Sequence, residues 1–180
     1  RLEKEPDNFP LHLCLGRYFF EVYQKFGGEA FYPEQMLLTR MEMHCALAYK
    51  NGYKDAYSSF ALGQKKLLDK EPLQAIPFFE DYLSFNPLNA EVHFNLALAY
   101  KLQGRRMKSI QSAIKAMEIY HDPQLKAETA RMIAIGYAEL KDTNRSLEFL
   151  RLADQIEPSN YYTLKYLLQT EILVDSLAFA

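Results

Sequence analysis

The sequence predicts an all-α fold built from antiparallel helix pairs, and three observations point to it. Apolar residues make up 49% of the 180 positions and charged residues 24%, a composition that supports a folded core and excludes disorder or a simple coiled coil. Only 7 glycines and 8 prolines are present, which is few for the frequent turns of an all-β chain. Third, small and large apolar residues recur at a spacing typical of helical repeats.

The repeat is visible when the segments beginning at Ala56, Ala90 and Ala127 are aligned. Small residues fall at the eighth and twentieth positions of each segment, where they let two helices approach closely, and larger residues fill the spaces between repeats. The spacing is 34 residues and then 37, which indicates a three-residue insertion at 124–126. The small residues are Gly63, Ala75, Ala97, Ser109, Ala134 and Ser146.

Helix-breaking glycines and prolines set the expected helix boundaries along the chain. An earlier unit is expected to begin at Phe9, to pass through a loop at 27–33 and to continue in a long helix over 34–50. Gly104 marks the turn inside its repeat. The second helices are expected to stop before two prolines, which cannot extend a helix. These are Pro87 and Pro158.

The two ends and one internal proline give further expectations. A last helix over about 161–177 is expected to cover the apolar face of the final repeat, which gives nine helices in all. Pro77 falls inside a second helix, where proline costs up to about 3 kcal/mol or bends the helix. Leu2 and Pro6 look like the end of a severed second helix, so we hypothesise that the chain is the repeat region of a longer protein.

The aligned residues resemble a known family. The stretch 91–100 followed by Gly104 resembles the first helix of a tetratricopeptide repeat (TPR), and 74–87 resembles the second helix. This resemblance implies a right-handed α-solenoid of antiparallel helix pairs, a TPR-like superhelix with a C-terminal capping helix. The implied divisions of one continuous domain are degenerate TPR-like helices over 1–55, repeats over 56–89, 90–123 and 124–160, and a capping helix over 161–180.

The residue types that carry catalysis are present but are not placed for it. No two histidines lie four residues apart on one helix, as a pair of zinc ligands requires, so His12 and His93 are expected to pack between helices. The sequence contains no nucleophile elbow and no phosphate-binding glycine loop. We therefore expect no enzyme activity, no catalytic residue, no metal and no cofactor.

Charge and hydropathy narrow the partners. Lys and Arg number 21 against 23 Asp and Glu, so a net charge of -2 gives no basic field for nucleic acid. The basic cluster at 105–108 has only three charges and is expected to be a solvated turn. No apolar stretch of about 18 residues predicts direct membrane insertion. Cys14 and Cys45 are expected to be buried thiols, which favours a cytoplasmic location; a periplasmic chain can have the same composition.

The TPR resemblance also implies a concave groove lined by the first helices, at repeat positions two, five, six, nine, and twelve to thirteen. Such an apolar groove would hold a peptide segment or a helix of another protein, with Gln64 and Asn95 bonding its backbone. The alternative is that Phe60, Phe94 and Leu98 only pack against neighbouring first helices. The candidate groove residues are Tyr57, Phe60, Gln64 and Leu68, then Glu91, Phe94, Asn95, Leu98 and Lys101, and finally Glu128, Arg131, Ile135 and Glu139.

The groove does not match the family's clamp for a C-terminal carboxylate, because Phe60 and Glu128 stand where that clamp has lysines. We therefore predict a non-catalytic protein-interaction scaffold that binds a partner peptide or helix. Two alternatives stay open: the recruiting or regulatory region of a larger multidomain enzyme, and a scaffold that self-associates through 161–180. The aromatic residues expected at packing positions are Phe79, Tyr82, Phe85, Tyr100 and Tyr137.

Overall fold

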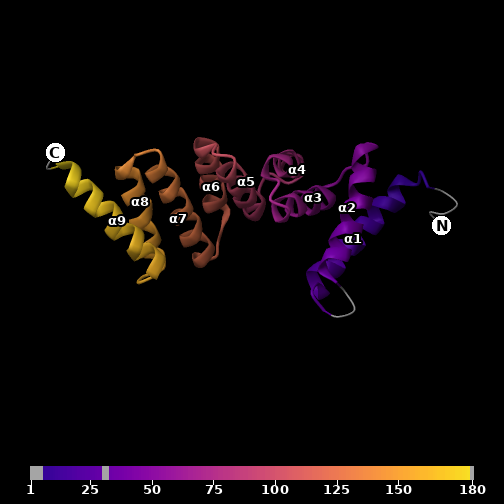
Figure 1. Cartoon of the computed structure of the whole chain (residues 1–180), viewed down its shortest axis with the longest axis horizontal. Helices are drawn as coiled ribbons and strands as arrows, with labels where there is room; N and C mark the ends of the chain where they lie inside the picture. The colour runs from indigo at the N-terminus through magenta and orange to yellow at the C-terminus, as the bar shows by residue number, and fades with distance from the viewer. Residues whose placement is uncertain (1–5, 30–32, 179–180) are drawn as a thin grey trace. The chain divides into compact units, whose positions relative to one another are not determined.

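The computed structural model describes residues 6–29 and 33–178 of the chain. Within these ranges the chain forms nine helices and no strand, and neighbouring helices pack in pairs (Figure 1), which confirms the all-α prediction. Leu2, which the sequence placed in a severed helix, lies outside the described residues. The helices are α1 (Phe9–Phe26), α2 (Glu34–Lys50), α3 (Ala56–Leu68), α4 (Pro72–Phe85), α5 (Ala90–Leu102), α6 (Arg106–Ile119), α7 (Pro123–Glu139), α8 (Thr143–Ile156) and α9 (Tyr161–Ala178).

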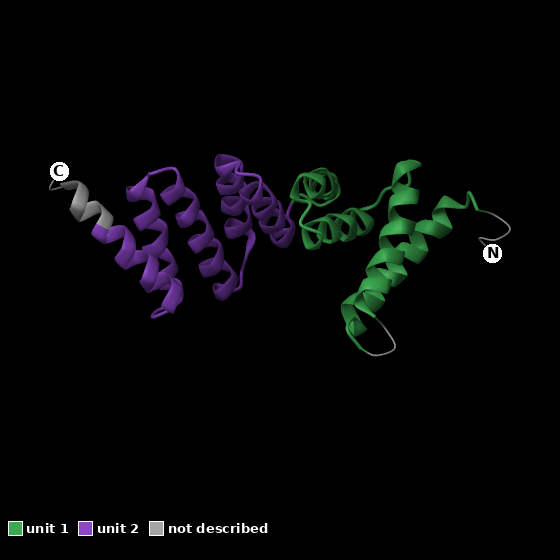
Figure 2. Cartoon of the chain, in the orientation of Figure 1, with its two compact units in different colours: residues 1–87 green, residues 88–180 purple. Residues whose placement is uncertain are grey.

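The helices divide into two compact units, residues 1–87 and residues 88–180 (Figure 2). In unit 1, α1 pairs with α2 and α3 pairs with α4, and α3 also contacts both α1 and α2. In unit 2, the pairs are α5 with α6 and α7 with α8, while α6 packs on α7 and α9 packs on α8. In the part of the chain that is described, no helix is both long and apolar enough to cross a membrane.

Side-chain caps explain where several helices begin. The backbone N–H of Ser58 donates to Asp55 Oδ1 (2.7 Å) in a capping box at the start of α3. The N–H of Val92 donates to Asn89 Oδ1 (3.0 Å) at the start of α5. Because each cap satisfies an N–H group that has no partner inside the helix, α3 and α5 begin at the residues from which the repeat spacing was counted.

The core of unit 1 forms where α1, α2 and α3 meet around large buried side chains. Phe20 is 1% exposed, and Met41 and Leu62 are buried with it. In the α3–α4 pair, a methyl group on Gly63 would come within 2.6 Å of the Phe79 ring, so the small eighth residue is needed for this packing. Helix α4 continues across Pro77.

The core of unit 2 uses smaller residues. Ala97 on α5 is fully buried, and the Ser109 hydroxyl of α6 donates to its carbonyl oxygen (2.8 Å), which ties the paired helices together. Ile133 and Tyr137 of α7 pack in the same cluster. Helix α7 begins at Pro123 and has 17 residues against 13 in α5, so the three inserted residues lengthen this helix.

Two predictions of burial are wrong. Cys14 is exposed, because it lies two residues from the buried His12 and therefore roughly 200° around α1. Phe85 is 53% exposed, because it lies six residues after the buried Phe79, roughly 120° away around α4. Cys45 is buried as predicted, and burial raises the pKa of its thiol to about 12.

Candidate functional site

A cavity of about 230 Å³ lies in unit 2, between α5, α7 and α9. Its charged lining comes from the last turn of α5 and the first half of α7, and its apolar and aromatic lining from α7 and α9. The lining residues are Lys101, Glu128, Arg131, Met132, Ile135, Tyr162 and Tyr166. The structure thus brings together four of the predicted groove residues, Lys101, Glu128, Arg131 and Ile135.

Helical spacing places the lining residues of α7 on one face of that helix, and those of α9 on one face of theirs. Glu128, Arg131 and Ile135 follow one another at intervals of three and four residues, which puts them on one face of α7. Tyr162 and Tyr166 are four residues apart in the first turns of α9 and share a face in the same way.

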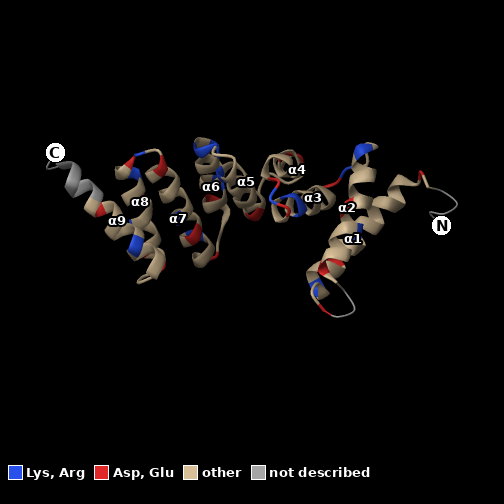
Figure 3. Cartoon of the chain, viewed as in Figure 1, with Lys and Arg blue, Asp and Glu red and all other residues tan. Residues whose placement is uncertain are grey.

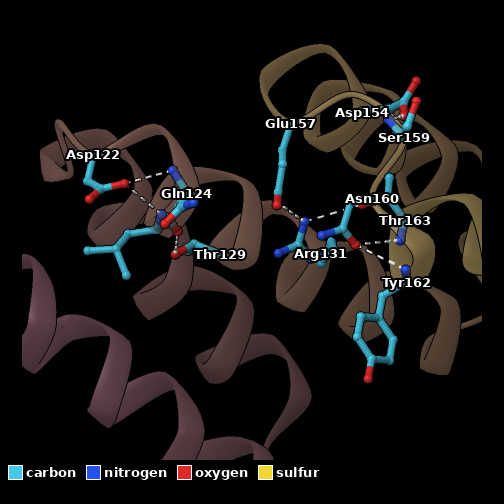
Figure 4. A network of polar contacts seen from close by, with 11 residues as sticks. Asp122, Gln124, Thr129, Arg131, Asp154, Glu157, Ser159, Asn160, Tyr162 and Thr163 are labelled. Atoms are coloured by element: carbon cyan, nitrogen blue, oxygen red, sulfur yellow. Dashed lines mark hydrogen bonds and ion pairs between the residues drawn. The ribbon is translucent and has the colours of Figure 1, made fainter.

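Arg131 holds three segments of unit 2 together. Its Nη1 donates to Glu157 Oε2 (2.8 Å) and to Thr163 Oγ1 (3.3 Å), which links α7 to the turn before α9 and to α9 itself (Figure 4). The Arg131 side chain is only 16% exposed. Hydrogen bonds from Arg131 and from Asn160 hold the pKa of Glu157 below its usual value. The positive charge of Arg131 is therefore already compensated by a carboxylate.

Asn160 completes this network by capping α9. Its Oδ1 accepts hydrogen bonds from the backbone N–H groups of Tyr162 (3.0 Å) and Thr163 (3.3 Å), as Figure 4 shows. Thr163 is fully buried. The cap therefore fixes the first turn of α9, which carries Tyr162 into the lining of the cavity.

The other two charged residues of the cavity, Lys101 and Glu128, differ from Arg131 in their ion pairing. Within the described residues, Lys101 and Glu128 form no ion pair; Lys101 is half-buried and Glu128 is exposed. Acidic and basic residues are spread over both units, with neither sign dominating (Figure 3). The cavity therefore carries one positive and one negative group that have no ion-pair partner among the described residues.

An aromatic pair lies near Glu128. The ring centroids of Phe94 and Tyr120 are 6.5 Å apart with a T-shaped orientation. Burial raises the pKa of the Tyr120 hydroxyl, and the negative charges of Glu91 and Glu128 raise it further. Both carboxylates therefore act on the same hydroxyl, which marks one end of this face of α5 and α7 as acidic.

The remaining predicted groove residues of unit 2 lie along α5 and α7. Asn95 and Leu98 are half-buried on α5, in the same helix face as Phe94. Glu139 at the end of α7 pairs with Arg106 of α6 (2.8 Å), which directs it away from the cavity lining.

The predicted groove residues of unit 1 pack among aromatic rings. Tyr57 and Phe60 both make T-shaped contacts with the buried Phe20, with centroids 5.6 Å and 6.2 Å apart. Gln64 is half-buried and Leu68 is 54% exposed. At Phe60 the geometry agrees with the alternative from the sequence, in which this residue packs against a neighbouring first helix, and Tyr57 packs against the same Phe20 ring.

Three residues of the cavity were not among the sequence candidates: Met132, Tyr162 and Tyr166. The repeat register contained the signal for all three. Met132 occupies the sixth position of its repeat, and Tyr162 and Tyr166 occupy positions two and six when the register is continued from Tyr161. Treating α9 as a cap rather than as another first helix left the two tyrosines out.

The sequence also missed a histidine pair in unit 1. Nδ1 of His12 on α1 lies 2.7 Å from Nδ1 of His44 on α2, and Nε2 of His12 donates to the Pro6 carbonyl (3.1 Å). Because a carbonyl only accepts, neutral His12 uses Nδ1 to accept from His44. Burial lowers the pKa of His44, and His12 and Arg40 lower it further. Both rings are buried, as is the ring of His93.

The described residues contain no group of three or more His, Cys, Asp or Glu side chains placed to hold a metal ion.

Comparisons with known proteins bear on the fold and on the repeat. A tetratricopeptide repeat family model matches residues 78–111. No curated protein sequence matches the chain significantly. The solved structure of YrrB, described as a TPR protein with an unusual peptide-binding site, is 18% identical, with a TM-score of 0.71 over 91% of this chain and 76% of that one.

Two further solved structures share the fold. MamA is 19% identical, with a TM-score of 0.66 over 87% of this chain and 82% of its own. The second TPR domain of human RPAP3, solved in complex with an HSP70 peptide, is 16% identical, with a TM-score of 0.58 over 64% of this chain and 94% of its own. The tetratricopeptide repeat model therefore matches one repeat of the chain, and the fold of TPR proteins extends over most of its length.

Proposed function

We propose that the chain is a non-catalytic protein-interaction scaffold that binds a peptide segment or helix of another protein at the cavity between α5, α7 and α9. The observation that carries the proposal is the lining of this cavity, in which Met132, Ile135 and two tyrosines surround a space flanked by charged groups. Apolar pockets with a few placed polar groups are typical of binding sites. The peptide-binding sites described for YrrB and the RPAP3 domain lend support by similarity of fold.

The size of the cavity favours a peptide over a small-molecule ligand. Pockets that enclose small molecules typically measure about 300–1,000 Å³, whereas this one measures about 230 Å³. A space of this size fits a side chain of a partner, while the rest of the partner lies across the neighbouring surface of α5 and α7. An anchor residue in a pocket is a common arrangement at protein interfaces.

The test is an unbiased selection of displayed peptides against the whole chain, followed by affinity measurements on two variants. Ile135→Asp places a charge in the cavity lining, and we expect it to weaken the selected peptides by at least about tenfold, since an unpaired buried charge costs more than 1.4 kcal/mol. Leu125→Asp is the matched control, because Leu125 lies on the same helix, is 39% exposed and is not part of the lining.

Circular dichroism checks that both variants remain folded. Equal binding by Ile135→Asp and the wild-type chain would show that the cavity is not the binding site.

Self-association is a second candidate function, favoured by the exposed face of α9. Leu164, Leu168 and Ile172 are 46%, 61% and 60% exposed and lie four residues apart on one face. Leu164 and Leu168 hold repeat positions four and eight, which are buried in α5 at His93 and Ala97. Light scattering after size-exclusion chromatography tests this role: a dimer that Leu168→Glu converts to a monomer would support it, and a monomeric wild-type chain would exclude it.

We further propose a cytoplasmic location. The observation in its favour is that Cys14 and Cys45 are both free, one exposed and one buried, and exposed thiols persist in reducing compartments. Cell fractionation of the tagged protein tests the location directly.

A further inference from the structure

The face of α5 and α7 that borders the cavity has an acidic end and a basic end. Glu91 lies in the first turn of α5 and Lys101 in the last, ten residues and therefore about 15 Å apart along the helix. Glu91 and Glu128 both hold the second position of their repeats, in the first halves of α5 and α7, so they lie toward the same end of the two helices. Lys101 marks the other end.

Two of the charges at the cavity remain available to a ligand. Arg131 is bound to Glu157 and Thr163 and is only 16% exposed, so its charge is already used within the fold. Lys101 and Glu128 line the same cavity, yet within the described part of the chain neither forms an ion pair. A half-buried ammonium group gains most from a carboxylate supplied from outside, since its own solvation is already reduced.

The surface between the two ends is apolar. Leu98 lies half-buried on α5 one turn before Lys101, and Met132 and Ile135 lie on α7 in the lining of the cavity. A ligand that crosses from the acidic end to the basic end therefore passes an apolar pocket on its way.

We propose that this site, given the peptide-binding function proposed above, takes an internal extended segment whose apolar anchor enters the cavity between a basic residue facing Glu128 and an acidic residue facing Lys101. Because Glu128 and Lys101 line the same cavity, the two charged residues of the ligand closely flank its anchor, in an extended chain that advances about 3.3 Å per residue. The carboxylate comes from a side chain rather than a chain terminus, because Lys101 is a single point charge and Arg131 is already occupied.

The test uses three capped peptides and the whole chain. The first is acetyl-Gly-Lys-Ala-Leu-Ala-Glu-Gly-amide, the second exchanges its Lys and Glu, and the third replaces both with Gln. Methyl NMR signals of Met132 and Ile135 report binding at the cavity. We expect one of the two charged orders to bind about fivefold more tightly than the neutral peptide, as is typical of about 1 kcal/mol from partly exposed ion pairs. The favoured order also reveals the direction of the bound segment.

Charge reversal in the protein gives the matched control. Lys101→Glu is expected to weaken the favoured peptide about fivefold, and replacing the acidic residue of that peptide with Lys is expected to restore binding to this variant. Lys115→Glu makes the same change at an exposed position of α6 outside the cavity lining and is expected to change nothing.

The outcomes separate this inference from the function on which it rests. If all three peptides shift the Ile135 signal with equal affinity, the cavity binds peptides without charge selection, and the inference is wrong while the proposed function stands. If no peptide shifts this signal and the unbiased selection also finds no ligand for the cavity, both fail. Rescue of Lys101→Glu by the peptide whose acidic residue is replaced with Lys supports both.

Discussion

The same repeat position has different surroundings in the two units. Phe60 in unit 1 and Phe94 in unit 2 both occupy the fifth position of a first helix. Phe60 packs against the rings of Phe20 and Tyr82, whereas Phe94 contacts the ring of Tyr120 beside a face that opens into a cavity. The neighbouring side chains therefore decide how the same repeat position packs, and the following predictions test this difference.

The largest effect is expected from Phe20→Ala in unit 1. Phe20 is 1% exposed and contacts Tyr57 and Phe60, so its removal leaves a large cavity and should cost about 3–5 kcal/mol. Hydrogen exchange followed by mass spectrometry should show lost protection in α1–α3 and retained protection in α7 and α8. Equal loss in both units would contradict the independence of their cores.

The equivalent positions provide the direct comparison. Phe60→Ala should destabilise unit 1 more than Phe94→Ala destabilises unit 2, because Phe60 packs against a buried core cluster and two rings, while the ring contact of Phe94 is with the half-buried Tyr120. Urea denaturation of the two variants measures the difference. A larger cost for Phe94→Ala would show that Phe94 is mainly a core residue.

A smaller effect is expected from adding a methyl group at close helix contacts. In unit 1 the new methyl of Gly16→Ala would meet the backbone nitrogen of Cys45 at 3.0 Å and would overlap its sulfur, so we expect a cost of about 1–3 kcal/mol. In unit 2 the methyl of Gly136→Ala would meet the side chain of Ile110 at 2.8 Å.

Because a side chain can rotate away and backbone cannot, Gly136→Ala should cost less than Gly16→Ala. Thermal denaturation of the two variants compares the contacts. An equal cost would mean that the α1–α2 pair adjusts its backbone as easily as Ile110 adjusts its side chain.

The two units should also lose stability in different pH ranges. The pKa of His44 is below its ordinary 6.5 in folded unit 1, so the unfolded chain binds the proton more readily and stability falls as the pH drops through about 6.5. The pKa of Glu157 in unit 2 is below its ordinary 4.5, so its stabilising contribution is present above pH 4.5 and is lost below it.

Protection factors from hydrogen exchange, measured from pH 7.5 to 4, should therefore decrease first in unit 1. His44→Gln should flatten the dependence near pH 6.5, because glutamine keeps a donor for His12 and does not titrate. An unchanged dependence in this variant would assign it to another group.

The repeat register predicted the helices well because their determinants are local. The caps Asp55 and Asn89 and the breaker Pro87 act within a few residues of their own positions, so a single sequence contains the information that they use. The same reasoning explains why the small residues at Gly63 and Ala97 could be assigned to close helix contacts before the structure was known.

The site was less predictable because it depends on which side chains fill the space between helices. Phe60 and Phe94 hold the same repeat position, and no local feature of the sequence distinguishes them. The difference comes from a distant residue, because Phe60 packs on Phe20 of another helix pair. The pairing of His12 with His44 joins residues 32 positions apart on α1 and α2, in the degenerate part of the chain where the repeat pattern is weak. Exposure of Cys14 followed from the orientation of α1 against α2, which the N-terminal sequence pattern did not determine.

The smallest effects are expected at the ion pairs on the surface, where the two units also differ. Arg106 of unit 2 pairs with Glu139 while both side chains are largely exposed, at 45% and 38%, so Arg106→Met should cost at most about 1 kcal/mol.

Lys66 of unit 1 is 17% exposed and bonds both Glu42 and Glu71, and these bonds raise its pKa. Lys66→Met removes the cation that bridges Glu42 and Glu71, although Glu42 keeps its pair with Lys65 (3.5 Å), and should cost more. Urea denaturation in low and high salt distinguishes the pairs, because salt screens the exposed pair more strongly than the half-buried one. A greater loss for Arg106→Met would mean that burial does not set the strength of these ion pairs.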